Sequence, residues 1–177
     1  MFFIKKIPKI QHVIPVYAVI VTVTYGWSLI HFFWNLSSWL YFSSVGEIFV
    51  IFAYMMVVNL VESLFLLFFI IAIHYIIPSI WLSDQFIVKG VLSILIGLGF
   101  LIYRNHYFPA KALYELTSFQ WISILSVEVV IFIAPFYKTP FLCNAIEKLA
   151  DRFIVFLYIA IPVSVISIVI VLFRNLL

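Results

Sequence analysis

Charge is scarce in this sequence: only 10% of its 177 residues are Asp, Glu, Lys or Arg, whereas 67% are hydrophobic. A soluble domain carries about 25% charged and about 45–50% apolar residues. The chain has too little polar surface to cover a water-soluble fold, so the excess apolar residues are expected to face lipid. The ten Lys and Arg are spread along short segments, and the formal net charge of +3 therefore does not indicate nucleic-acid binding.

Cysteine is almost absent, and a single Cys143 excludes an internal disulfide. The sequence also lacks an H-E-x-x-H motif, zinc-type Cys/His spacing, G-x-S-x-G, a P-loop and a dinucleotide-binding fingerprint. We therefore expect neither a metal nor another cofactor, and we favour a protein that is not an enzyme.

Alternation of polar and apolar residues is missing from the long apolar runs, which argues against strands of a membrane barrel. Backbone polar groups in lipid must be satisfied within the chain, so these runs are predicted to be helices. The predicted fold class is all-α: one polytopic membrane domain over residues 1–177, with a bundle of about five transmembrane helices. The predicted spans are 13–34, 47–77, 86–103, 118–134 and 153–173.

The longest apolar run, residues 47–77, predicts one long helix. At about 1.5 Å per residue it extends roughly 46 Å, well beyond a hydrocarbon core of about 30 Å. Ser44 and Glu47 have the spacing of a capping box at its start, and Pro78 is expected to end it. Glu62 then lies near the bilayer midplane.

Several local signals refine the other spans. Pro15 is tolerable in the first turn of the first span, and Pro162 is expected to kink the fifth. Residues 35–46 contain no charge before Glu47 and read as a loop lying in the membrane interface. Ser93 and Gly97 form a small-xxx-small pattern, for which helix packing inside the bundle is favoured over self-association.

The segment before the fifth span is amphipathic and is predicted to be a short helical approach to it. Its apolar side chains share one face, opposite Lys148 and Arg152. These apolar residues are Ile146, Leu149, Ala150 and Phe153.

The distribution of positive residues predicts an N-terminus inside and a C-terminus outside. In this topology the outer segments hold three positive residues and the inner segments hold seven. The outer ones are Arg104, Lys111 and Arg174, and the inner ones are Lys5, Lys6, Lys9, Lys89, Lys138, Lys148 and Arg152. We expect a multi-pass protein of a bacterial cytoplasmic membrane.

Glu62 and Glu128 are the only formal charges deep within the predicted spans. An intramembrane charge costs about 2.5–3.5 kcal/mol on insertion scales, which makes such a residue a candidate functional site. Facing each other, the two carboxyl groups could share a proton or hold a cation. Asn59, one turn before Glu62, could contact the same partner. Alternatively, both are neutral groups bonded to nearby polar side chains, and this packing role is favoured.

Arg104, His106 and Lys111 in the outer loop are candidate contacts for a lipid headgroup, although a solvated loop is the more common arrangement. We expect an accessory, anchoring or assembly subunit of a larger membrane complex, which contacts the lipid bilayer and other membrane-protein subunits or a homo-oligomer. A small oligomeric proton or cation transporter or channel using Glu62 and Glu128 is the first alternative. A membrane enzyme that modifies lipid headgroups is the second.

Overall fold

Four long helices dominate the computed structural model, which describes residues 9–76, 86–107, 126–127, 130 and 140–176. They are α1 (Ile10–Phe42), α2 (Val45–Ile76), α3 (Phe86–Tyr107) and α5 (Pro140–Leu176). Every described residue outside them is also helical except Lys9, Ser43 and Ser44, so this part of the chain contains no strand. All four helices are long and apolar enough to cross a membrane. The all-α prediction is confirmed for the described residues.

The predicted span 118–134 lies mostly outside the described residues. Within it, Ser126, Val127 and Val130 are helical and exposed. A fifth transmembrane helix therefore stays a prediction.

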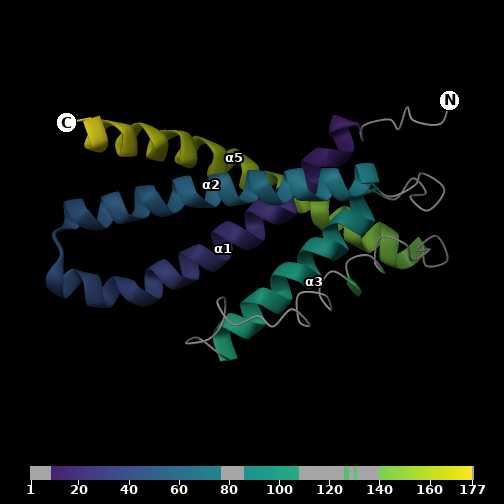
Figure 1. Cartoon of the computed structure of the whole chain (residues 1–177), viewed down its shortest axis with the longest axis horizontal. Coiled ribbons are helices and arrows are strands. Elements are labelled where there is room, and N and C mark those ends of the chain that lie inside the picture. Colours follow the sequence, from purple (N-terminus) through teal and green to yellow (C-terminus); the bar gives the residue numbers. More distant parts are fainter. Residues whose placement is uncertain (1–8, 77–85, 108–125, 128–129, 131–139, 177) are drawn as a thin grey trace.

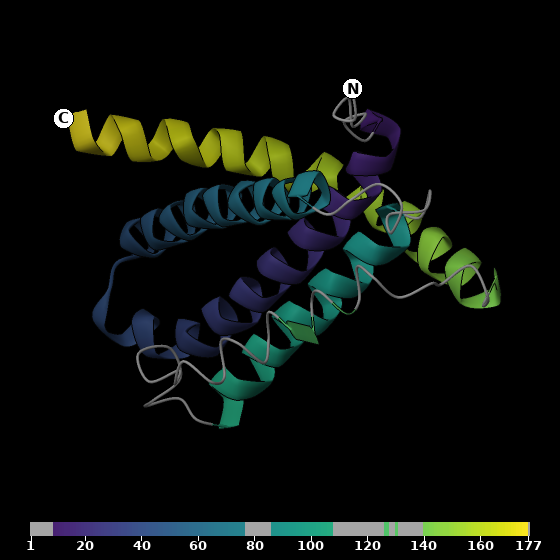
Figure 2. The same ribbon diagram turned by 45° about the vertical axis from the view of Figure 1, so that its right-hand side comes forward.

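The helices form a bundle in which α1 packs against α2, α3 and α5 (Figure 1). α2 and α5 lie side by side, and α3 lies beside α1, in both views (Figures 1 and 2). α1, α3 and α5 run in one direction and α2 runs in the other (Figure 1). The end of α3 consequently lies well away from the start of α5 (Figures 1 and 2).

α1 contributes more residues to the buried core than any other helix. Two clusters of buried side chains follow this helix, one joining all four helices and one joining only α1, α2 and α5. The first contains Val16, Val19, Ile20, Ile70, Phe86, Val91, Ile94 and Ala150. The second contains Ala18, Val21, Tyr25, Met56 and Leu157. Because α1 supplies the most buried residues and packs against each of the other three helices, it is the central element of the bundle.

A glycine allows α3 to approach α1 closely. A Cβ placed on Gly90 would lie 3.2 Å from both methyl groups of Val16, tighter than an ordinary van der Waals contact. Ser93, one turn later, is buried as well. Gly90 and Ser93 are therefore used for packing inside the bundle, whereas Gly97, the other member of the predicted small-xxx-small pattern, is only half-buried.

α1 is longer than predicted at both ends. Residues 35–42, expected as part of an interfacial loop, continue the helix, and only Ser43 and Ser44 separate α1 from α2. No proline or glycine interrupts this stretch. The side-chain amide of Asn35 donates to the carbonyl oxygen of His31 at 2.9 Å, and the Trp39 ring packs on Phe32 with centroids 5.4 Å apart.

Pro15 lies inside α1 rather than in its first turn, because the helix begins at Ile10. A proline in a helix interior removes one backbone hydrogen bond and bends the helix. The first turns of α1 indeed run in a different direction from the rest of the helix (Figures 1 and 2).

α5 joins the amphipathic approach and the predicted fifth span into one helix of 37 residues. Ala150 is fully buried, and Ile146 and Phe153 pack against the same core. Leu149 is exposed, so the predicted apolar face is narrower than expected. The helix continues through Pro162, and Figure 2 shows a bend in its middle, as predicted for an internal proline.

Candidate functional site

The inner face of α2 carries polar side chains that bind to α1. Ser28 on α1 donates a hydrogen bond to Oδ1 of Asn59 at 2.7 Å. Farther along, the hydroxyl groups of Tyr17 and Ser63 share a hydrogen bond at 3.3 Å. Asn59 is only 2% exposed and Ser63 is fully buried. Hydrogen bonds between helices stabilise a membrane bundle by about 0.6–1.7 kcal/mol each, so these contacts help to fix the α1–α2 register.

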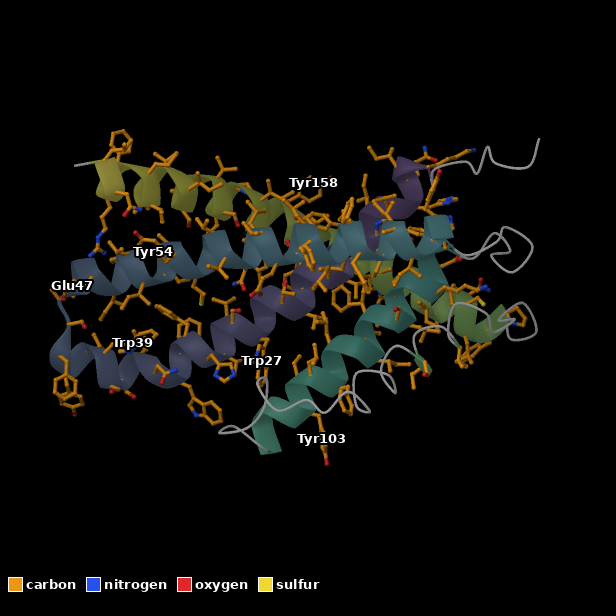
Figure 3. The ribbon with its side chains drawn as sticks, in the orientation of Figure 1. Trp27, Trp39, Glu47, Tyr54, Tyr103 and Tyr158 are labelled. Atoms are coloured by element: carbon orange, nitrogen blue, oxygen red, sulfur yellow. The ribbon has the colours of Figure 1, made fainter. Side chains whose placement is uncertain are left out.

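A second set of polar contacts attaches α5. The Tyr25 hydroxyl lies 2.7 Å from Oγ of Ser164, and Ser164 is fully buried. Near the C-terminal end of α5, the Tyr54 hydroxyl donates to Oδ1 of Asn175 at 3.1 Å. The same hydroxyl accepts from Nδ2 of Asn175 at 3.0 Å. Figure 3 shows Tyr54 on α2 beside the last turns of α5. We call the contacts made by Tyr17, Tyr25, Ser28, Tyr54, Asn59, Ser63, Ser164 and Asn175 the polar seam.

The polar seam was not predicted as a unit, although the sequence contains a signal for it. Tyr17, Tyr25 and Ser28 are spaced by 8 and 3 residues within an apolar run. At about 100° per residue, this spacing places them near one face of a helix. Their partners on α2 and α5 could not be assigned without knowing how the helices pack.

Asn59 does not share a partner with Glu62 in this structure. Its Oδ1 accepts from Ser28, while its buried Nδ2 has no hydrogen-bond partner in the described part of the chain. Residues three apart differ by about 60° around a helix. That rotation is enough to turn Asn59 toward α1 and leave Glu62 on the outside.

Glu62 is exposed on the outer face of α2. It lies 17 residues after Val45 and 14 before Ile76, about 26 and 21 Å from the two ends of the helix. Its carboxylate makes no hydrogen bond or ion pair with the described residues. The neighbouring exposed side chains are all apolar: Val58, Val61, Phe65, Phe68 and Phe69. We call these five residues and Glu62 the outer stripe of α2.

The other predicted site residues are not placed by the structure. Glu128 and Lys111 lie outside the described residues, and for Arg104 and His106 only the helical backbone of α3 is described. Pairing of Glu62 with Glu128, and the outer-loop contact, therefore stay predictions. Among the described residues, no three His, Cys, Asp or Glu side chains gather in one place.

Lys89 occupies an unexpected position. The charge count treated it as part of an inner segment, but it lies in the first turns of α3 and is only 1% exposed. Burial at the helix start places its long side chain within the packed end of the bundle. Lys89 therefore contributes to the interior rather than to a basic surface.

The glutamate at the start of α2 has a local role. The backbone nitrogen of Ser44 donates to the Glu47 carboxylate at 2.8 Å, and the Glu47 nitrogen donates to Oγ of Ser44 at 3.3 Å. This reciprocal arrangement is the predicted capping box. Figure 3 places Glu47 at the end of the bundle where α1 joins α2.

Apolar side chains outside, hydrogen-bonded side chains inside and four helices of membrane-spanning length define a helical, multi-pass membrane protein. Comparison with protein-family models, curated proteins and solved structures finds no match. The polar seam and the outer stripe are therefore the features of the molecule that bear on its function.

Proposed function

We propose that this protein is a non-enzymatic accessory, anchoring or assembly subunit of a larger membrane complex. The observation that carries the proposal is the exposed Glu62 on the outer stripe of α2. A carboxylate in the central part of a membrane helix costs about 2.5–3.5 kcal/mol on insertion scales when it faces lipid. A partner helix that covers the stripe removes this cost.

The interior of the bundle supports the same assignment. Polar side chains of α2 that face α1 already have partners, as Asn59 and Ser63 show. Glu62 is thus not part of the contacts that hold α1, α2 and α5 together. A group with no role in the described bundle is available for contact with another subunit. The orientation with the N-terminus inside, and a bacterial cytoplasmic membrane, belong to this proposal.

A proton or cation relay through Glu62 and Glu128 is less well supported. A relay within one chain requires carboxyl groups that face a shared interior path. In the described bundle, Glu62 turns away from the polar seam. A relay through Glu62 would have to run along the outside of α2.

Site-specific photo-crosslinking in intact membranes tests the assembly function. A photoreactive residue replaces Val61 on the outer stripe, and a matched control replaces Ile159 on the outer face of α5. Both side chains are 61% exposed, so lipid access is comparable. We expect a crosslink from position 61 to a different membrane protein and only lipid adducts from position 159.

The adducts are identified by mass spectrometry. Lipid adducts alone at position 61, together with purification of the protein without any other subunit, would contradict the proposed function. An adduct from position 61 that contains only this protein would indicate a homo-oligomer and count against it as well.

A further inference from the structure

We propose, as an extension of the assembly function, that the partner of the outer stripe is a transmembrane helix with a Lys or Arg side chain at the depth of Glu62. The inference combines the charge of Glu62, its depth in α2 and the shape of the side chains around it.

Charge complementarity identifies the partner's chemistry. An ionised carboxylate only accepts hydrogen bonds, so its partner in lipid must donate them, and a cation does so most strongly. This chain carries no Lys or Arg in the apolar stretches 10–76 and 153–173. The described cations lie toward helix ends, at Lys9, Lys89, Lys148, Arg152 and Arg174.

A second copy of the chain supplies no such cation. Two copies in one membrane are related by an axis along the membrane normal, so each residue meets its counterpart at the same depth. Glu62 would then face another Glu62, and two carboxylates at close range cannot both stay ionised cheaply. Two facing carboxyl groups can share a proton, but a second copy supplies no cation at this depth, so a cationic partner comes from a different protein.

The shape of the outer stripe also favours a long basic side chain. Its exposed residues between Tyr54 and Phe69 include no glycine, alanine or serine. Small residues are what allow two membrane helices to approach closely. With Val and Phe on this face, the two helix axes stay farther apart. The flexible stem of Lys or Arg can bridge that gap to the Glu62 carboxylate.

The test uses designed single-span peptides as probes. Each is a polyleucine helix with lysine caps, and its central residue is Lys, Leu or Glu. The full-length protein is labelled with a donor fluorophore and each peptide with an acceptor, both in phosphatidylcholine vesicles. From energy transfer, we expect the Lys peptide to bind about 3- to 20-fold more tightly than the Leu peptide, as for one polar contact between membrane helices.

Two variants make the test specific. Glu62→Leu should abolish the preference for the Lys peptide, and Glu62→Lys should transfer the preference to the Glu peptide. Because Glu62 is exposed and makes no hydrogen bond or ion pair with the described residues, both variants are expected to fold, and circular dichroism in the same vesicles checks this. A reversed preference in Glu62→Lys cannot arise from a general loss of structure.

Two outcomes would overturn the inference. One is equal binding of the Lys and Leu peptides by the parent protein. The other is self-association of the labelled protein that disappears in Glu62→Leu, because it would identify a second copy as the occupant. Equal peptide binding, combined with a crosslink from position 61 to another subunit, would reject the cationic partner and leave the assembly function standing.

Discussion

Asn59 and Glu62 lie one turn apart on α2, and the two side chains have opposite surroundings. Asn59 is buried against α1 and accepts a hydrogen bond from Ser28. Glu62 faces outward among valine and phenylalanine side chains and has no partner in the described chain. The inner face therefore helps to hold the bundle together, and the outer face carries the residue from which a partner is proposed.

The comparison shows that polarity within a membrane span does not by itself indicate a functional site. The polar groups of the seam are used for packing, since each links two helices of the same chain. Only a polar group that the fold leaves uncovered requires another molecule. On α2, the seam residues Asn59 and Ser63 lie within one turn of Glu62. The direction of the side chain, and not its depth, therefore distinguishes a packing group from an uncovered one.

The largest expected effect is all-or-none and concerns whether α2 crosses the bilayer at all. In a Cys143→Ser background, single cysteines at Lys9 and Lys148 should react with a membrane-impermeant maleimide from one side. A cysteine at Ser37 should react only from the other. Labelling in sealed vesicles of known orientation gives the result. Reaction of positions 37 and 148 from the same side would contradict the expected path of the helices across the bilayer.

The next effect tests the packed interior, through the close contact between α3 and α1. Gly90→Leu should destabilise the bundle by about 1–3 kcal/mol, because the added side chain must displace Val16. Gly99→Leu is the matched control, since a Cβ there meets no atom within 4 Å. Thermal unfolding in detergent measures both. Equal losses would show that the α1–α3 contact is not tight.

The comparison itself is tested by Asn59→Leu against Glu62→Leu. Removal of the Ser28 contact by Asn59→Leu should lower bundle stability by about 0.6–1.7 kcal/mol, the range for polar contacts between membrane helices. Glu62→Leu should leave the stability of the isolated protein unchanged or raise it. Unfolding in mixed micelles gives both values, and a larger loss for Glu62→Leu would place Glu62 inside the fold.

The smallest effect concerns Glu47, at the start of α2. Glu47→Gln should leave stability almost unchanged, because glutamine also accepts the capping hydrogen bond from Ser44. Ser44→Ala should cost about 1 kcal/mol, since it removes the N-cap hydroxyl. Unfolding experiments measure the stability of both variants. A larger loss of stability for Glu47→Gln than for Ser44→Ala would reveal a role for the Glu47 charge.

Much of the helical pattern was predictable because apolar runs and caps are local signals. The capping box at Ser44 and Glu47 placed the start of α2 to within two residues, whereas the predicted stop at Pro78 lies outside the described residues. The continuation of α1 to Phe42 was missed because interfacial aromatic residues suit a loop and a helix equally well. Helix ends are decided there by packing, such as that of Trp39 on Phe32.

The direction of each polar side chain was beyond the sequence. Periodicity shows that Asn59 and Glu62 lie about 60° apart, but it does not show which of them faces α1. That choice depends on the crossing of α1 and α2, which the contacts of Tyr17 and Ser28 reveal. The burial of Lys89 was missed for the same reason, because it depends on how α3 docks against its neighbours.

The two-residue link at Ser43 and Ser44 has a consequence for biosynthesis. During insertion, the tip of the α1–α2 hairpin must pass through the hydrocarbon layer to reach the far side. Between Lys9 and Glu62 the chain carries one formal charge, at Glu47, and this carboxylate is already hydrogen-bonded at the helix start. With almost no hydrated chain to translocate, α1 and α2 can enter the bilayer together as one preformed unit.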